Sequence, residues 1–167
     1  MSISIYHASV PVFVRGFAQL SGLLDKAVAD AEARKIEPDV LVNARLAPDM
    51  RPLSAQVQMA SDTAKGAAAR LAGVEVPGFA DTETSFPELQ ERIAKTVAFL
   101  EGLPEAGFAG AEQRPITLKL RGAEVTLSGA DYLLKRQVPN FFFHLTTAYA
   151  ILRHNGVPIG KRDYLGF

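Results

Sequence analysis

The chain contains no cysteine and no tryptophan among its 167 residues. The absence of cysteine excludes disulfide scaffolds, thiolate metal sites and cysteine nucleophiles, and it leaves the redox compartment open. The chain also has no net charge at pH 7, because 18 Lys and Arg residues balance 18 Asp and Glu residues. Binding to nucleic acid or to an anionic membrane depends on clustered basic side chains that neutralise phosphate. We therefore expect no nucleic-acid partner and no membrane partner.

Long hydrophobic runs are absent as well. The apolar cluster at residues 141–143 is interrupted by His144, long before the roughly 20 residues that a membrane span needs. Arg15 lies inside the first apolar run, and no signal-peptide pattern precedes it. We expect a soluble, cytoplasmic protein.

The composition that is present is globular. Hydrophobic residues make up 48% of the chain and charged residues 22%, which is not the composition of a disordered segment. A chain of this length can bury a sizeable core without metal or disulfides. We expect a single domain over residues 1–167.

The first half of the chain predicts two helices from apolar residues at helical spacing. The first covers residues 9–34, with Pro11 in its opening turns, where a missing amide costs least. The second covers residues 52–71, has an alanine-rich core face and ends at Gly73. The connector between these two helices is long enough to allow a crossover.

The second half predicts two more helices. Ser85 and Glu88 stand at capping-box spacing and open a helix that ends near residue 102. Ser128 can cap the last helix, which is apolar on most of its circumference and is therefore expected to be the buried one. Pro139 falls inside this last helix, so we expect a kink or a break near Gln137.

Between the third and fourth helices the hydrophobic period changes from helical spacing to strict alternation. This alternation, with Gly122 at its turn, predicts a β-hairpin. A lone hairpin is marginal in water, so its apolar face is expected to lie on the helices. That face consists of Ile116, Leu118, Leu120, Val125 and Leu127. The fold class that follows is all-α, a four-helix bundle with a small β-hairpin inserted between its third and fourth helices.

Three stretches of the sequence carry a family resemblance. They are YHASVPVFVRGFAQLSGLLDKA near the start, QVQMASDTAKGAAARLAG in the second helix, and NFFFHLTTAYAILRHNGVPIGKRDYLGF at the end. Together they resemble the bacterial domain-of-unknown-function family numbered nineteen ninety-three, which is placed with the DinB/YfiT-like four-helix proteins. The resemblance covers nearly the whole chain. It implies a DinB-like bundle that pairs through helices as a homodimer.

The resemblance also implies the place of a metal site. In typical DinB-like proteins one histidine of the second helix and two histidines four residues apart on the fourth hold a divalent metal. Here His144 is in place, but its partner four residues earlier is Asn140, and the second helix contains no histidine. One imidazole with amides makes a poor zinc site. The DinB-type metal site is therefore expected to be incomplete, and no metal or cofactor is expected.

A substitute polar set is conceivable on the second helix. Gln58 and Asp62 are four residues apart and could face His144 across the bundle, which makes these residues and Asn140 the candidates for lining a ligand pocket. The alternative is structural, because Asp62 and Lys65 stand at i, i+3 and could form an ion pair. Four other basic residues are spaced singly, as is typical of solvated faces or interhelical pairs. They are Arg70, Arg92, Arg153 and Lys161.

Two functions remain open from the sequence, and no catalytic residue is identified. The first is a structural or small-ligand-binding helical protein, stable as a homodimer. The second is an enzyme with a pocket around His144, resembling the thiol-dependent transferases and isomerases of the wider superfamily and requiring a metal or thiol cofactor. The second rests on analogy of fold, and a fold alone does not confer chemistry.

Overall fold

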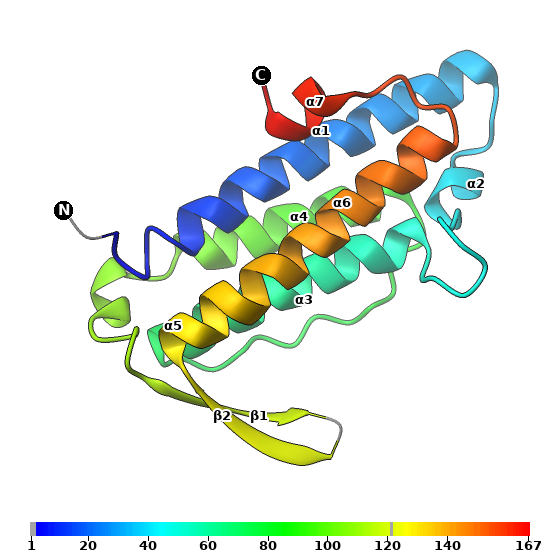
Figure 1. Ribbon diagram of the computed structural model, residues 1–167. Coiled ribbons are helices and arrows are strands. Elements are labelled where there is room, and N and C mark those ends of the chain that lie inside the picture. Colours follow the sequence, from blue (N-terminus) through cyan, green and yellow to red (C-terminus); the bar gives the residue numbers. More distant parts are fainter. Residues whose placement is uncertain (1–2, 121) are drawn as a thin grey trace.

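Four long helices lie side by side in the computed structural model, which describes residues 3–120 and 122–167 apart from the side chain of Leu120 (Figure 1). They are α1 (Val10–Arg34), α3 (Leu53–Ala72), α4 (Phe86–Glu101) and α6 (Val138–His154). Apolar residues from all four form one core cluster. None of the helices described is long and apolar enough to cross a membrane.

Shorter elements connect these helices. The helical ones are α2 (Pro38–Val42), the 3-10 turn η1 (Glu105–Phe108), α5 (Gly129–Asp131), the π-helical turn η2 (Tyr132–Gln137) and α7 (Lys161–Leu165). Two strands, β1 (Pro115–Leu120) and β2 (Ala123–Ser128), form an antiparallel hairpin between η1 and α5.

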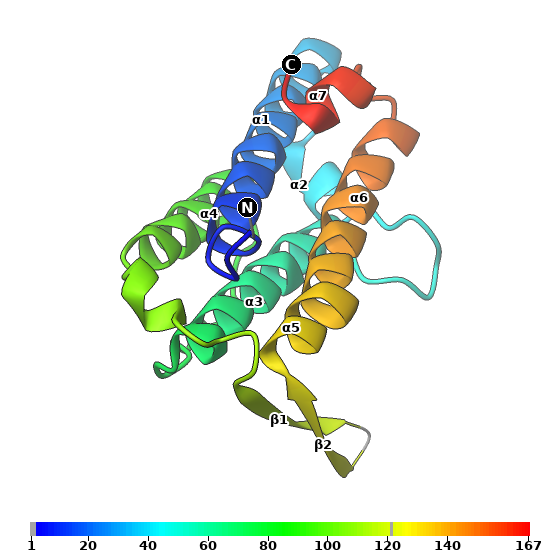
Figure 2. The ribbon, with the colours of Figure 1, turned by 60° about the vertical axis from the view of Figure 1, so that its left-hand side comes forward.

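The directions of the helices determine which connector must run the length of the bundle. Helices α1 and α6 run the same way, and α3 and α4 run the opposite way (Figures 1 and 2). The segment from residue 74 to residue 84, called the strap below, therefore has to return along the length of α4. Eleven extended residues span roughly 36 Å, more than the roughly 24 Å of a 16-residue helix.

Two connectors depart from a simple up-and-down order. Helices α1 and α3 each pack on α4 and on α6, so α1 and α3 stand diagonally opposite each other, and α2 with residues 43–52 leads across the end of the bundle from one to the other. The connector between the first and second helices is therefore a crossover, which its length had allowed. The strap is the other such connector, because it joins the parallel neighbours α3 and α4.

The helix ends follow their local sequence signals. Helix α3 stops at Gly73, which adopts a left-handed φ of 74°. Helix α4 begins with the expected capping box, in which Ser85 Oγ accepts from the Glu88 amide and the Glu88 carboxylate accepts from the Ser85 amide. Ser128 Oγ likewise accepts from the Asp131 amide.

The last long helix meets expectation near Gln137 and differs from it on its outer face. The π-helical turn η2 ends at Gln137 and interrupts the regular α-helix there, although the chain stays helical, and Pro139 lies in the first turn of α6. The helix is not buried all round. Phe141 is completely buried, whereas 56% of Phe143 is exposed, because α6 packs on α1 and α3 and leaves its remaining face outside.

The close approach of α1 and α6 depends on a glycine. A Cβ built on Gly16 would lie 2.4 Å from a ring carbon of Phe141, which real Cβ atoms do not tolerate. Without that Cβ, the Phe141 ring packs edge-on between Phe13 and Phe17, with centroid distances of 5.0 and 5.1 Å.

The predicted hairpin is present, but only its base is deeply buried. Ile116 pairs with Leu127, and Leu118 pairs with Val125. Ile116 is buried in the core, whereas the other three side chains are half-buried. The side chain of Leu120 and all of Arg121 lie outside the described residues. The hairpin extends away from the end of the bundle (Figure 1).

Candidate functional site

Helix α3 carries polar side chains on two of its faces. One face meets α6 and contributes Gln56 and Thr63, which pair with His144 and Asn140; these four residues are called the seam below. The other face meets the strap and α4. Its contacts centre on Arg92, so the second group is called the Arg92 network. Its members are Gln58, Ser61, Asp62, Lys65, Asp81, Glu83 and Arg92.

In the seam, His144 is held by a chain of two hydrogen bonds. The side-chain nitrogen Nε2 of Gln56 donates to the carbonyl of Arg51 at 3.0 Å, which fixes the orientation of the amide. The oxygen Oε1 of Gln56 then lies 2.9 Å from Nδ1 of His144. An amide oxygen only accepts, so Nδ1 must carry the proton.

The other ring nitrogen of His144 is left with a lone pair. Burial lowers the pKa of His144, so the ring is neutral near pH 7, and Nε2 is the unprotonated nitrogen. Within the described residues, Nε2 makes no hydrogen bond. In these residues, every fully buried side-chain nitrogen or oxygen has a hydrogen-bond partner. Because Nε2 has none, it must be accessible to solvent, although only 8% of His144 is exposed. Nε2 is therefore an oriented hydrogen-bond acceptor at the surface of the bundle.

Asn140 lies one turn before His144 on α6. Its Nδ2 donates to Oγ1 of Thr63 at 2.7 Å. Of the four candidate pocket residues, the structure thus places His144 and Asn140 on one seam. Their partners on α3 are Gln56 and Thr63, which the sequence analysis did not select.

The donor set of the seam does not fit a divalent metal. It comprises one imidazole, two amides and one hydroxyl, already paired with one another. Zinc prefers three or four histidine, cysteine or carboxylate ligands. Throughout the part of the chain that the structure describes, no three such side chains gather closely enough to hold an ion.

The two candidate residues on α3 point away from His144. Gln58 donates to Glu83 at 2.9 Å, and Asp62 pairs with Lys65 at 2.9 Å, as the structural alternative predicted. The reason is helical periodicity. At 100° per residue, Gln58 lies 200° and Asp62 about 240° around the helix from the seam residue Gln56. The expectation that they face His144 across the bundle is therefore wrong.

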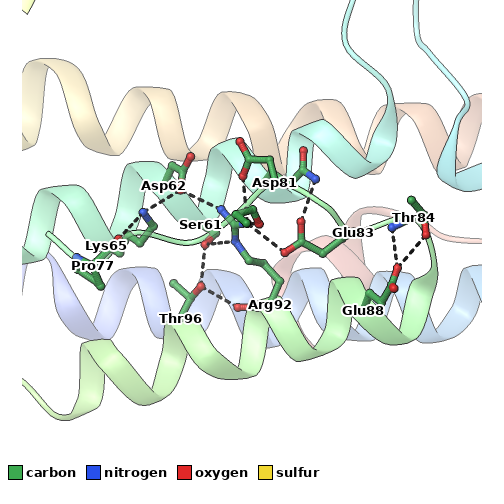
Figure 3. Close-up of polar contacts among 12 residues, drawn as sticks. Ser61, Asp62, Lys65, Pro77, Asp81, Glu83, Thr84, Glu88, Arg92 and Thr96 are labelled. Carbon is green, nitrogen blue, oxygen red and sulfur yellow. Dashed lines mark hydrogen bonds and ion pairs between the residues drawn. The ribbon is translucent and has the colours of Figure 1, made fainter.

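Arg92, on α4, is the centre of the second group (Figure 3). Only 1% of its side chain is exposed. Its Nη2 lies 2.9 Å from Asp62, its Nη1 lies 3.0 Å from Asp81 and 3.0 Å from Glu83, and its Nε donates to Ser61 Oγ at 2.9 Å. One guanidinium thus joins α3, α4 and the strap.

Backbone and aromatic contacts complete the attachment of the strap. Arg92 donates to the carbonyl of Ala80 at 2.9 Å, and Lys65 donates to the carbonyl of Pro77 at 2.8 Å. The ring of Phe79 lies between 4.2 and 5.4 Å from three cationic groups, within the range of cation–π attraction. They are those of Lys65, Arg92 and Lys95.

Glu83 shows how completely this network is satisfied. Burial raises the pKa of its carboxyl, but hydrogen bonds from Gln58 and Arg92 and the charge of Arg92 outweigh burial, and the pKa lies below its ordinary value. Glu83 therefore stays ionised and paired. A buried cation in which each of the three guanidinium nitrogens has a partner favours a structural role, the attachment of the strap, over a catalytic one.

Arg92 and Gln56 were not among the predicted site residues, although the sequence carried a signal for each. Arg92 lies on the buried face of α4, which also carries Leu89, Ile93 and Thr96, so its side chain cannot be solvated. Gln56 falls in the buried phase of α3, beside Val57. A polar residue in an apolar phase predicts a buried hydrogen-bond partner.

The tyrosines near the bundle and the other two histidines have local explanations. Tyr132 is buried, burial raises its pKa, and its hydroxyl donates to the carbonyl of Gly66 at 3.4 Å. The hydroxyl of Tyr164 lies 2.9 Å from that of Thr146. His7 and His154 are exposed.

Comparison with known proteins gives a family and a solved relative. The family model described as "Domain of unknown function (DUF1993)" matches residues 5–165. A crystal structure of a protein from Shewanella denitrificans, described as a DinB family member, is 44% identical in sequence. It superimposes with a TM-score of 0.92, and the match covers 98% of this chain and 92% of that one. No curated protein matches the chain.

Proposed function

The chain belongs to the DUF1993 family, and within that family we propose that it binds a small polar molecule at the seam between α3 and α6, without a metal. The ligand is held by Nε2 of His144, and Asn140 contributes a second polar group from the same helix. Gln58 and Asp62, the other two candidates for the pocket, belong instead to the Arg92 network.

One observation carries this proposal, the oriented lone pair of His144. The hydrogen bonds from Gln56 to Arg51 and from His144 to Gln56 fix which ring nitrogen is protonated. A histidine with only a core-packing role needs no accessible acceptor. The complementary ligand carries a hydrogen-bond donor, such as a hydroxyl, an amide or an amine. Asn140 uses one N–H of Nδ2 on Thr63, so its Oδ1, which is also an acceptor, and its second N–H are left for the ligand.

A second candidate function is an enzyme in which the same lone pair removes a proton from a bound hydroxyl or thiol. A neutral imidazole with an oriented Nε2 is the form that general-base catalysis needs. The lowered pKa of His144 makes this nitrogen a weaker base, however, and favours hydrogen bonding over proton removal. Binding is therefore the function that the geometry supports best.

Nuclear magnetic resonance of the imidazole nitrogens tests the proposal directly, because the chain has only three histidines. His144 should appear as the neutral tautomer protonated on Nδ1, and a library of small hydroxyl, amide and amine compounds should yield ligands that shift its Nε2 signal. His144→Phe should abolish their binding, and His154→Phe, an exposed site on the same helix, should not.

Two outcomes would overturn this reading. One is a His144 protonated on Nε2, which leaves no acceptor for a ligand. The other is retention of stoichiometric zinc or nickel that is lost in His144→Phe. Turnover of a thiol-dependent substrate that is lost in the same variant would favour the enzyme instead.

We further propose that the protein is a cytoplasmic homodimer. The family resemblance implies pairing through helices, and the exposed ring of Phe143 on the outer face of α6 supports it. Light scattering at micromolar concentration should give twice the monomer mass. A monomer under these conditions would contradict the dimer without affecting the seam.

A further inference from the structure

A cleft lies between α1, the start of α2 and the start of α4, away from the residues of the seam. Its volume is about 490 Å³, the size of pocket that takes a small organic molecule. Six of its lining residues carry the argument. They are Asp25, Val28, Pro38, Asp39, Phe86 and Pro87.

The walls of this cleft are apolar and rigid. Phe86 is 2% exposed and belongs to the core cluster, and Val28 packs against that cluster. Pro38 and Pro87 stand in the first turns of α2 and α4, where their rings have fixed backbone angles. Such walls change little on binding, so the cleft is preformed for an apolar group.

The charged groups at this cleft are both acidic. Asp25 accepts a hydrogen bond from Nε2 of Gln90 at 2.8 Å, a neutral partner that leaves the negative charge in place. Asp39 lies in the first turn of α2. In residues 3–120 and 122–167, neither carboxylate forms an ion pair. The carboxylates of the Arg92 network, by contrast, all have a cation.

The helix N-termini at this cleft offer little to an anion. Pro38 and Pro87 have no amide hydrogen. The capping box of α4 uses the amides of Ser85 and Glu88 internally. The polar chemistry available to a ligand is therefore that of two carboxylates, beside an apolar wall.

We propose that this cleft binds a small organic cation, an ammonium or amidinium group joined to an aromatic or aliphatic body. The body lies against Phe86, Val28 and the proline rings, and the cation pairs with Asp25 and Asp39. This site is independent of the seam, because the two share no residue. It gives the chain a second ligand, recognised by charge and by apolar contact rather than by a neutral acceptor.

A matched series of three probes tests the proposal on the unmodified protein. 4-Phenylbutylamine, 4-phenyl-1-butanol and 4-phenylbutanoate share one body and differ in charge. In amide chemical-shift titrations the amine should bind about fivefold more tightly than the alcohol, as expected for ion pairs at a partly exposed site. The largest shifts should fall on residues of the cleft, and the anion should bind more weakly than the alcohol.

Variants separate the charge from the cavity. Asp25→Asn combined with Asp39→Asn should remove the preference for the amine over the alcohol and leave binding of the alcohol unchanged. Asp49→Asn, a change at an exposed aspartate outside the cleft, should leave the preference intact. Circular dichroism verifies that each variant is folded.

The proposal is overturned if the alcohol or the anion binds as tightly as the amine. It is also overturned if the shifts caused by the amine lie outside the cleft, or if no shift appears up to 10 mM, about the weakest affinity that such a small probe should show. The probe series needs no substitution, so a variant that fails to fold does not remove the test.

Discussion

The seam and the Arg92 network lie on two faces of the same helix, yet they solve the burial of polar groups in different ways. The network is charged and closed, because the donors of Arg92 meet carboxylates, a hydroxyl and a backbone carbonyl. The seam is neutral, and Nε2 of His144 is left without a partner among the described residues. Polar burial by itself therefore does not mark a functional site; the proposal of a site at His144 rests on its unused and accessible acceptor.

The position of each group explains this contrast. The strap is a long connector with no regular structure, and only its contacts with α3 and α4 can hold it on the bundle. Helices α3 and α6 already pack closely, and buried apolar residues of both belong to the core cluster, so few polar contacts are needed to hold them together. The following predictions test the contrast, from the largest expected effect to the smallest.

Removal of Arg92 should have the largest effect on stability. Arg92→Met keeps most of the aliphatic volume but leaves the half-buried Glu83 and the buried Ser61 without their main partner. We expect a loss of about 3 kcal/mol in the free energy of unfolding, measured by urea denaturation. Glu91→Met, an exposed change at the neighbouring position of α4, should cost less than about 0.5 kcal/mol. Equal losses in the two variants would mean that the network does not fasten the strap.

The carboxylates of the network should differ according to their burial. The side chain of Glu83 is 12% exposed and that of Asp81 is 54% exposed, although both lie 3.0 Å from Arg92. Glu83→Gln should cost roughly 1–2 kcal/mol, and Asp81→Asn roughly 0.5 kcal/mol or less, because solvent screens the exposed pair. The same denaturation experiment measures both. The reverse order would show that burial does not control the strength of these pairs.

The two regions should lose stability in different pH windows. Burial lowers the pKa of His144 below the 6.5 of an unfolded chain, so the unfolded state binds the proton first, and stability falls as the pH drops below about 6.5 toward the folded pKa. The pKa of Glu83 lies below 4.5, so its contribution is present above about pH 4.5 and is lost as the pH falls through its folded pKa.

Denaturation midpoints between pH 3 and pH 8 measure these two contributions. His144→Gln should flatten the curve in the upper window only, and Glu83→Gln should flatten it in the lower window only. A variant that changed both windows would indicate that the seam and the network are coupled through α3.

The smallest expected effect on stability is at the edge of the seam. Thr63→Val removes the acceptor for Asn140 Nδ2, and Asn140 is exposed and can bond to water instead. We expect a loss of about 0.5 kcal/mol or less, together with weaker binding of any ligand found at His144. Unchanged affinity would limit the binding site to His144 alone.

Particular residues show how far the sequence could predict the site. Its family resemblance led to His144 and Asn140, and spacing predicted the pair of Asp62 with Lys65. Gln56 and Arg92 were missed because a polar residue on the buried face of a helix indicates that it has a hydrogen-bond partner but does not indicate which residue that partner is. The partner of Gln56 is His144, which lies 88 residues away in the sequence, and partners of Arg92 lie in the strap.

Much of the helical framework was determined by the sequence alone. The capping box at Ser85, the stop at Gly73 and the alternation around Gly122 act over a few residues, so local patterns are enough to predict them. Tertiary structure alone decided that α3 and α4 run the same way, that the strap crosses between them, and that Asp62 faces Arg92 rather than His144. These features depend on which helix faces meet, and that is set by the packing of the whole chain, through contacts between residues distant in sequence.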